Sequence, residues 1–362
     1  MFGLIAKLNA YGFDDSALKI VLSYLSDRRQ RTKVNSSFSN WEQLLCGVPQ
    51  GSVLGPLLFN IYINDIFFQF VDAHVCNFAD DTTLTACNVK IADLLHELED
   101  NTLSAILWFE NNYMKLNQSK CHFLTCGTCE HLWVKVGDEK IWETQSEKLL
   151  GMIVDKKLSF DLHLRTLCKK VNQKVSALAR IVPYLPFPKR HLIMKTFIES
   201  QFTYCPLVWM FCSRTMNMKI NRIHERTLRL VYQDYNSTFE ELLSKDNSLC
   251  FHHRNIHQVA IEMYKVKHNL SPPFMKDIFS EIDRQTRSGT SFSHPNVRTV
   301  KRGDRSLRSF GPIVWNTMLP DAFKKCETLD LFKDSIKSWK PDNCPCDICK
   351  VYVKGLGYTV AI

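Results

Sequence analysis

Long apolar runs are missing from this sequence: no uninterrupted stretch reaches the ~18 apolar residues that a membrane-spanning helix requires. The nearest candidate, residues 202–212, is short and is interrupted by Pro206. Residues 1–7 carry neither the basic region nor the cleavage site of a secretory signal peptide. We therefore expect an intracellular protein, nuclear or cytoplasmic, that is neither secreted nor inserted in a membrane.

Internal repeats and low-complexity tracts are also absent. The 14 cysteines are scattered through 362 residues, a pattern that favours reduced thiols over a disulfide framework. Hydrophobic residues make up 45% of the chain and charged residues 23%, as is typical of a globular protein. The length exceeds what one compact core usually supports, which indicates two or three domains.

The net charge of +9 is unevenly distributed along the chain. Residues 1–160 contain 14 Lys and Arg against 19 Asp and Glu, a net charge of −5. Residues 161–362 contain 32 against 18, a net charge of +14. An acidic first part and a basic second part fit a metal-dependent centre followed by a polyanion-binding surface, although uneven solvated surfaces would give the same totals.

Apolar spacing predicts helices over residues 16–25, from about 57 to 70, and from about 91 to 113. Asp14 or Asp15 is expected to cap the first of them. The third is expected to bury Leu94, Leu95, Leu98, Leu103, Ile106 and Leu107. Residues 28–34 indicate a basic, partly exposed strand, and residues 136–139 a hairpin turn. Beyond residue 159 the pattern is helical, with an apolar face formed by Leu164, Leu167, Val171, Val175 and Leu178.

Two adjacent carboxylates, Asp80 and Asp81, lie between two predicted strands, residues 75–79 and 82–85. We expect an antiparallel hairpin with both carboxylates at its open tip. Mg²⁺ usually takes one or two carboxylates together with substrate phosphates, so such a tip suits it. The pair at positions 14 and 15 is explained by helix capping, so an Asp-Asp dipeptide alone does not identify a metal site.

A loop rich in glycine and proline precedes these carboxylates at residues 47–56, with the sequence GVPQGSVLGP. Glycines at this density let the backbone approach a bulky partner closely, and the N-terminus of the following helix favours anions. The alternative is an ordinary loop that leads into a helix. That alternative gives no reason for such a rigid loop to stand one strand away from paired carboxylates.

Together these segments resemble the reverse transcriptases of non-LTR retrotransposons, of the LINE type and jockey-like. Residues 47–56 with 58–65 (LFNIYIND) are similar to motif B of that family, and residues 78–82 (FADDT) to motif C. Residues 117–120 (NQSK) resemble motif D, and residues 148–151 (KLLG) motif E. Three further segments resemble the region that follows the polymerase in these elements: residues 202–209 (FTYCPLVW), 224–229 (HERTLR) and 311–316 (GPIVWN).

The resemblance implies a nucleotidyltransferase: an RNA-directed DNA polymerase of a transposable element that uses two Mg²⁺ ions, an RNA template, a DNA primer and deoxynucleoside triphosphates. It implies that Asp80 and Asp81 bind the metal, and that Lys120 acts near the triphosphate. The positions that would line the template and incoming nucleotide are Gly47, Pro49, Gln50 and Gly51. Those that would hold the primer end are Leu149, Leu150 and Gly151.

The family pattern also contains a catalytic aspartate in motif A, upstream of the segment that residues 4–13 match. Met1 stands after that point, and Asp14 and Asp15 cannot substitute because they follow the matched segment. The chain is therefore expected to be an N-terminally truncated copy without motif A and the fingers, which alone extends a primer poorly or not at all. A catalytically dead nucleic-acid-binding remnant and a fossil reading frame without selected function stay open as alternatives.

Basic residues in the second half include an arginine row at Arg222, Arg226 and Arg229, spaced i, i+4 and i+7 on one helical face. Such a row can neutralise nucleic-acid phosphates. A solvated face, relieved by pairing of Glu225 with Arg229, explains it equally well. A second cluster could follow an RNA backbone as a basic loop: Arg298, Lys301, Arg302, Arg305 and Arg308.

Three cysteines near the C-terminus, Cys344, Cys346 and Cys349, would supply three of the four ligands of a structural Zn²⁺ site. No Cys or His follows them, and the nearest earlier thiol is Cys326. The fourth ligand is thus not evident from the sequence.

The expected fold class is α+β: a partial polymerase palm, an antiparallel sheet with packed helices, then a mostly α-helical thumb-like region and an irregular basic tail. We assign the partial palm with motifs B to E to residues 1–158. The helical thumb or post-polymerase region would span residues 159–282, and the basic C-terminal region with the cysteine cluster residues 283–362. The sequence does not predict the oligomeric state.

Overall fold

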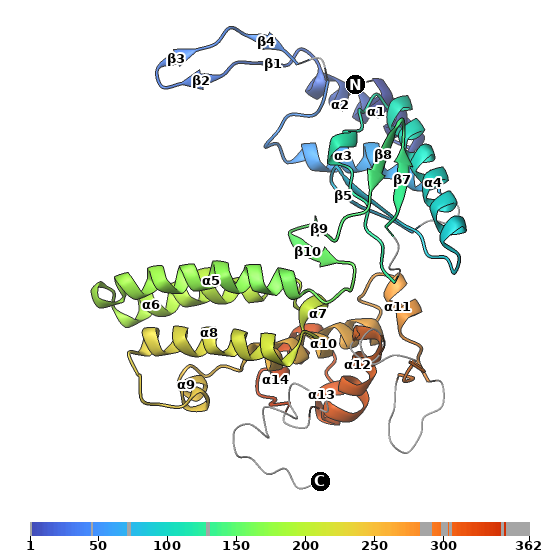
Figure 1. Ribbon diagram of the computed structural model, residues 1–362. Coiled ribbons are helices and arrows are strands. Elements are labelled where there is room, and N and C mark those ends of the chain that lie inside the picture. Colours follow the sequence, from blue (N-terminus) through green and yellow to red (C-terminus); the bar gives the residue numbers. More distant parts are fainter. Residues whose placement is uncertain are drawn as a thin grey trace. The chain divides into compact units, whose positions relative to one another are not determined.

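A computed structural model describes residues 2–44, 46–70, 74–127, 131–282, 292–297, 303, 306–341 and 344. The chain divides into two compact units, residues 1–145 and 146–362 (Figure 1). Helices and small antiparallel strand pairs make up the described chain, which confirms the α+β class. Each described strand pairs with only one other, so the single sheet expected for the palm is not formed among these residues. The assignment of palm and thumb-like functions stays a prediction.

The helices of the first unit are α1 (Phe2–Ala10), α2 (Asp15–Leu25), α3 (Leu54–Ile63) and α4 (Ile91–Asn111), with 3-10 helices at Asn64–Gln69 and Gln118–Lys120. Asp14 caps α2, accepting a hydrogen bond from the Ala17 N–H at 2.7 Å, as predicted. Helix α3 begins three residues earlier than predicted. Proline at its third position, Pro56, is compatible with a first turn, whose N–H groups have no partner within the helix.

The strands of the first unit form four local pairs. They are β1 (Arg29–Gln30) with β4 (Glu42–Gln43), β2 (Lys33–Val34) with β3 (Ser37–Phe38), β5 (His74–Phe78) with β6 (Asp81–Thr85), and β7 (Trp133–Val136) with β8 (Glu139–Trp142). The predicted strand over residues 28–34 is therefore two short strands. The predicted turn between β7 and β8 is present, with Gly137 at φ +61°.

Three small apolar clusters stabilise the first unit. Their buried members are Leu4, Leu8, Leu25 and Leu58; Phe123, Leu132, Val134 and Val136; and Ile63, Ile66 and Trp108. The predicted stripe of α4 is wrong at Leu103 and Leu107, which are about half exposed. The helix instead buries Ala105 and Trp108, and at 100° per residue this orientation turns positions 103 and 107 away from the core.

The second unit begins with a hairpin, β9 (Ser146–Leu149) and β10 (Met152–Asp155), and continues as helices. The longer helices are α5 (Asp161–Ile181), α8 (Arg214–Tyr232), α10 (Phe251–Lys267) and α14 (Leu329–Ile336). The shorter ones are α6 (Phe187–Ile193), α7 (Pro206–Trp209), α9 (Phe239–Lys245), α11 (Phe274–Ile278), α12 (Leu307–Ile313) and α13 (Asp321–Lys324). Turns of 3-10 helix (Val182–Tyr184, Glu199–Phe202) and of π-helix (Met194–Ile198, Val314–Met318) join or extend them.

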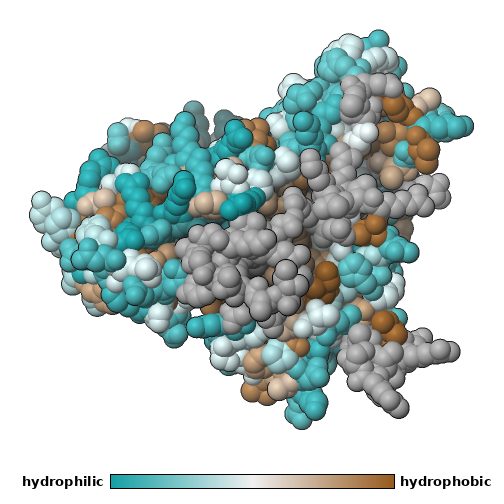
Figure 2. All heavy atoms as spheres, turned by 60° about the horizontal axis from the view of Figure 1, so that its bottom comes forward, coloured by the Kyte–Doolittle hydropathy of each residue, from teal (hydrophilic) through white to brown (hydrophobic). Residues whose placement is uncertain are grey.

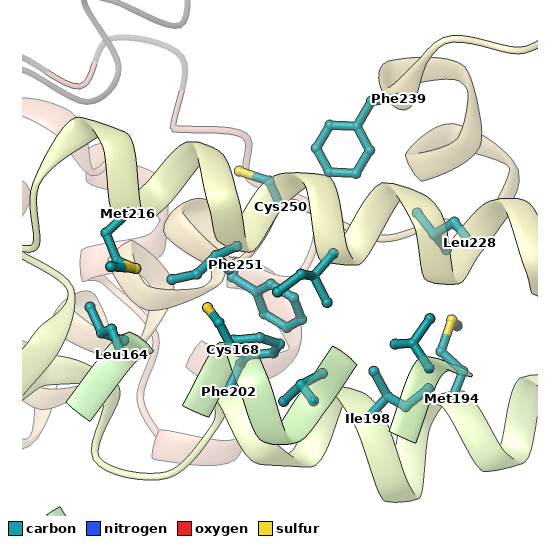
Figure 3. Packing of buried hydrophobic residues seen from close by; sticks show 14 of the residues in the cluster. Leu164, Cys168, Met194, Ile198, Phe202, Met216, Leu228, Phe239, Cys250 and Phe251 are labelled. Carbon is teal, nitrogen blue, oxygen red and sulfur yellow. The ribbon is translucent and has the colours of Figure 1, made fainter. Parts of the chain in front are cut away.

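Two apolar cores hold this unit together. The first lies between α5 and α8 and includes Cys168, Phe202 and Phe251 (Figure 3). The predicted face of α5 is confirmed, with four of its five residues fully buried and Leu167 packed at the edge. The second core gathers α10, α12 and α14 around Trp315 and Phe332. None of the described helices combines the length and hydrophobicity needed to cross a bilayer.

Candidate functional site

The hairpin β5–β6 presents the paired carboxylates at its tip. Phe78 pairs with Asp81, so the turn consists of Ala79 and Asp80, with Ala79 at φ +53°. Asp81 is therefore the first residue of β6 rather than part of the turn. Both Asp80 and Asp81 are exposed. The structure confirms the predicted antiparallel hairpin and moves its turn by one residue.

The two faces of β5 differ in burial as the alternation predicts. Val75 and Asn77 are half-buried, whereas Cys76 and Phe78 are exposed. Strand β6 packs on α4, one of the two helices expected to cover it. The Asn77 amide and the Thr82 hydroxyl face one another in register, and their buried polar atoms have no hydrogen-bond partner in the described structure. Unsatisfied polar groups on the covered face therefore lie close to the exposed carboxylates in the sequence, since Thr82 directly follows Asp81 and Asn77 lies three positions before Asp80.

The carboxylates suit a metal ion that takes most of its ligands from elsewhere. No group of three or more His, Cys, Asp or Glu side chains is poised to hold a metal within the described residues. Two exposed carboxylates at an open tip do fit Mg²⁺, which retains waters and combines one or two carboxylates with substrate phosphates.

The loop at residues 47–51 owes its shape to its glycines. Gly47 has φ +84° and Gly51 φ +79°, in the region that side chains other than glycine rarely adopt. The Ser52 hydroxyl donates to the Pro49 carbonyl at 2.7 Å and accepts from the Gly55 N–H at 3.0 Å. This pair of hydrogen bonds folds the loop onto the start of α3.

At the start of α3, the surroundings of Gly55 leave no room for a side chain. A Cβ atom there would lie 2.9 Å from the Ser52 hydroxyl oxygen and 3.0 Å from the Pro49 carbonyl oxygen. Gln50 is exposed, and Pro49 is half-buried beneath it. The end of the loop is thus fixed against the start of α3, and the Gln50 side chain is accessible to a partner.

Lys120 ends the 3-10 helix at Gln118–Lys120, and its side chain is exposed. Its backbone N–H donates to the Asn117 carbonyl at 3.0 Å. No hydrogen bond or ion pair joins Lys120 to Asp80 or Asp81 in the part of the chain that the structure describes. The structure therefore does not bring these predicted catalytic residues into contact.

The predicted primer-end residues form the turn between β9 and β10. Leu149 pairs with Met152, while Leu150 and Gly151 have φ of +46° and +86°. The Tyr204 hydroxyl donates a hydrogen bond to the Leu150 carbonyl. Tyr204 is held in turn by the buried Trp209, whose indole N–H donates to the Tyr204 carbonyl at 3.0 Å. Two segments that the sequence showed separately, 148–151 and 202–209, thus meet at one turn.

A basic groove of about 930 Å³ runs along α5 beside α8. Its lining contains four cationic residues, three neutral polar residues and no carboxylate: Arg165, Lys169, Asn172, Gln173, Ser176, Arg180 and Lys219. The α5 members span 15 positions, a length of about 22 Å at 1.5 Å per residue. The end of the second unit that carries these helices, at the left of Figure 2, is mostly hydrophilic. This groove was not predicted from the sequence. A signal was present, because the α5 residues that line the groove lie on the face opposite the predicted apolar face.

The predicted arginine row continues this groove along α8. Lys219, Arg222 and Arg226 are spaced i, i+3 and i+7 and are exposed. Arg229 differs, because it pairs with Glu225 at 2.7 Å and donates to the Tyr235 carbonyl at 2.6 Å. The alternative of Glu225 pairing is confirmed for Arg229, which makes it a structural residue at the end of the helix.

A buried ionic cluster lies at the other side of this core. Glu199 is paired with Arg254 at 2.5 Å and Lys195 at 3.1 Å, and His224 approaches it to 3.5 Å. Burial alone would raise the pKa of Glu199, but hydrogen bonds from His224 and Arg254 and the nearby positive charges hold it well below its usual range. Burial lowers the pKa of His224. His224 thus joins helices within the unit rather than facing a ligand.

The buried cysteines of the second unit are inert thiols. Burial raises the pKa of Cys168, that of Cys212 to about 12 and that of Cys250 to about 11, so a reactive thiolate is disfavoured at neutral pH. Cys344 is buried next to the second core.

Two predictions from the sequence concern residues outside the described ranges. The remaining members of the predicted zinc site, Cys346 and Cys349, lie there, as do Arg298, Lys301, Arg302 and Arg305. The zinc site and the second basic cluster therefore stay predictions.

Comparison with known proteins matches residues 2–154 to the family described as reverse transcriptase (RNA-dependent DNA polymerase). These residues, which contain the carboxylate hairpin and the glycine-rich loop, thus match a reverse transcriptase domain. Reverse transcriptases as a family use divalent metal ions, an RNA template and nucleotide substrates. No solved structure matches the chain.

The relatives of this domain come from mobile elements. The RNA-directed DNA polymerase from mobile element jockey of Drosophila melanogaster is 26% identical over 245 residues, 63% of this chain and 26% of the relative. The probable RNA-directed DNA polymerases from transposon BS and transposon X-element of the same fly are 23% and 25% identical over 63% and 59% of this chain. These matches confirm the resemblance to non-LTR retrotransposon reverse transcriptases. The chain spans about a quarter of the length of these relatives.

Proposed function

We propose that residues 2–154 carry catalytic carboxylates of an RNA-directed DNA polymerase. The supporting observation is the exposed pair Asp80 and Asp81 at the tip of β5–β6, inside the domain that matches the reverse transcriptase family. In the proposed reaction the primer 3′-hydroxyl oxygen bonds to the α-phosphorus of a deoxynucleoside triphosphate. The bond from that phosphorus to the pyrophosphate oxygen breaks, and the hydroxyl proton leaves.

Asp80 and Asp81 would hold Mg²⁺, which when bound supplies positive charge to the reacting phosphate oxygens and lowers the pKa of the attacking hydroxyl. Lys120 would stabilise charge on the triphosphate or donate a proton to the leaving group. The rigid loop at residues 47–51 would position the template base and the incoming nucleotide through its backbone and Gln50. The observed glycine conformations support this role, because they leave the backbone uncovered by side chains.

The second unit would also contact the primer and template. The turn at Leu149, Leu150 and Gly151 would hold the primer end, and the Tyr204 hydroxyl supports the turn. The groove on α5 and the row on α8 would contact phosphates, because they contain cations without carboxylates over about 22 Å. One strand of a B-form duplex places about six phosphates along that length at 3.4 Å each.

Iron-mediated cleavage tests the metal site directly. Fe²⁺ with ascorbate and peroxide, added in place of Mg²⁺, should cut the backbone close to Asp80 in the full chain, and excess Mg²⁺ should suppress the cut. Asp80→Asn should abolish it. Asp15→Asn is the matched control, because Asp15 belongs to the other adjacent pair and is equally exposed. Cleavage that survives Asp80→Asn would exclude the hairpin as the metal site.

A second candidate function is nucleic-acid binding without catalysis. The observation that favours it is the absence, among the described residues, of a third carboxylate, His or Cys grouped with the hairpin pair. Primer extension on an RNA template separates the two candidates. Mg²⁺-dependent extension that disappears in Asp80→Asn supports the polymerase, whereas RNA binding with neither extension nor iron cleavage supports the binding protein.

A further inference from the structure

The strands β1 to β4 form an exposed two-stranded ribbon, residues 28–43, that has no core of its own. Figure 1 shows it as a long blue extension that leaves the helices of its unit. All eight strand residues are exposed. The ladder continues between the pairs, where the Ser39 N–H donates to the Thr32 carbonyl at 2.9 Å. None of the five apolar clusters of the described chain includes a ribbon residue.

Aromatic rings and cations alternate on this ribbon. The Arg31 guanidinium lies 3.9 Å from the centre of the Phe38 ring and 4.6 Å from that of Trp41. The two ring centres are therefore no more than 8.5 Å apart, the sum of those distances. Lys33 approaches the Phe38 ring to 5.3 Å. Even so, Phe38 is 51% exposed and Trp41 57% exposed, so much of each ring is open to a partner.

The ribbon carries mostly positive charge, with Glu42 as its one carboxylate. Between Asp27 and Glu42 the chain contains four cations, at positions 28, 29, 31 and 33, and no carboxylate. An apolar protein surface would have to bury these cations without a counter-charge, which is costly. A polynucleotide supplies phosphates for the cations and bases for the rings, the combination by which single strands are held without sequence preference. An A-form duplex offers phosphates but no free bases for the rings, because its bases are stacked and its major groove is too narrow for a ribbon.

The ribbon also leads directly into the glycine-rich loop. Strand β4 ends at Gln43, and Gly47 follows four residues later. We propose that the ribbon binds single-stranded RNA, stacking bases on Phe38 and Trp41 and pairing phosphates with Arg29 and Lys33, so that it holds unpaired template next to the loop. The inference that the bound strand is the RNA template rests on the proposed polymerase function. The inference that the ribbon binds single-stranded RNA does not.

Cross-linking in EDTA tests this binding apart from the metal site. The full chain is irradiated with single-stranded RNA that carries 4-thiouridine, and the modified peptides are identified by mass spectrometry. Adducts are expected on Phe38 or Trp41, and a duplex of the same sequence should give none there. Adducts that appear only outside residues 28–43 would overturn the proposal. Loss of iron cleavage at Asp80 would count against the polymerase function while leaving these adducts unaffected.

Affinity measurements on variants provide the second readout. Trp41→Ala or Phe38→Ala should weaken binding of single-stranded RNA about 5- to 150-fold, the loss expected for one stacked base. Trp142→Ala is the matched control, because Trp142 is 53% exposed in the same unit and should have no effect. Arg29→Gln with Lys33→Gln should lower the salt slope by about 1.4, at about 0.7 per phosphate of a single strand.

Equal affinities of Trp41→Ala and Trp142→Ala would refute the proposal. A change in oligomeric state with unchanged RNA affinity would instead assign the ribbon to contacts between copies of the chain. Because the ribbon lies outside the apolar clusters, these variants should keep the wild-type circular dichroism spectrum, so a loss of binding reports on the ribbon itself.

Discussion

Charge removal in the groove on α5 and α8 should reduce the salt dependence of RNA binding by a calculable amount. The variant replaces its four cations with glutamine: Arg165, Lys169, Arg180 and Lys219. At about 0.7 to 0.9 per phosphate contact, four contacts amount to a slope of about 2.8 to 3.6 in log affinity against log salt. Over a fourfold rise in salt, the wild-type chain should therefore lose about 50- to 150-fold more affinity than the variant.

The row on α8 offers a second, smaller perturbation. Arg222→Gln with Arg226→Gln should lower the slope by only about 1.4 to 1.8, because two contacts are removed. Arg229→Gln should leave the slope unchanged, because Arg229 is already occupied by Glu225 and the Tyr235 carbonyl. The structure thus distinguishes two exposed arginines, which are expected to bind phosphate, from one that is already paired and is not.

Fluorescence anisotropy of a labelled RNA, titrated at several KCl concentrations, measures these slopes. Lys333→Gln with Lys337→Gln is the control in the same unit, since these lysines of the α14 region lie outside the groove and pair with Asp330 and Asp334. An unchanged slope in the four-residue variant would refute the assignment of the groove to phosphate binding. A decrease in the control equal to that of Arg222→Gln with Arg226→Gln, which also removes two cations, would show that only net charge matters.

Three further predictions concern stability. Gly55→Ala should lower the free energy of unfolding of the first unit by about 1–3 kcal/mol through overpacking, whereas Gly3→Ala, which meets only ordinary contacts in α1, should not; urea denaturation compares them. The second unit should lose stability as the pH falls through about 6.5, because the lowered pKa of buried His224 leaves the proton to the unfolded chain. It should lose stability again below about 4.5, where the unfolded chain takes up a proton at Glu199 that the folded chain, with its lowered pKa, does not. Denaturation at pH 7.5, 5.5 and 3.5 measures both, and the lower step should be smaller in Glu199→Gln, because Asp234 and Asp246 also have lowered pKa values. Tyr204→Phe should remove one hydrogen bond, about 0.5–1.5 kcal/mol, and speed amide exchange in the β9–β10 turn; unchanged exchange would mean that the hydroxyl does not hold the turn.

Local patterns in the sequence predicted the carboxylate hairpin well. Alternation with a period of two separates the half-buried from the exposed residues of β5, whereas β6 is half-buried at three consecutive positions. The cap at Asp14 and the buried face of α5 are similarly local. The start of α3 was placed three residues too late, since Pro56 is compatible with a first helical turn.

Contacts between distant segments were not predictable in this way. Periodicity placed Arg229 on an exposed face, but its acceptor is a carbonyl six residues on, beyond the helix end. The groove needed Lys219 of α8 to lie beside α5, a packing that neither helix specifies alone. The contact of Tyr204 with the turn at Leu150 joins residues 54 positions apart, so no local spacing could predict it.

Helix α10 belongs to both apolar cores of the second unit, and this has a consequence for cooperativity. Its first residue, Phe251, packs in the core between α5 and α8, while Ile256 to Val266 pack in the core around Trp315. The neighbouring residues Trp209 and Met210 are divided between the same two cores. Loss of either core would remove part of the packing that keeps α10 helical, and would thereby weaken the other. The two cores are thus expected to melt in a single transition, although each alone is large enough for a small domain.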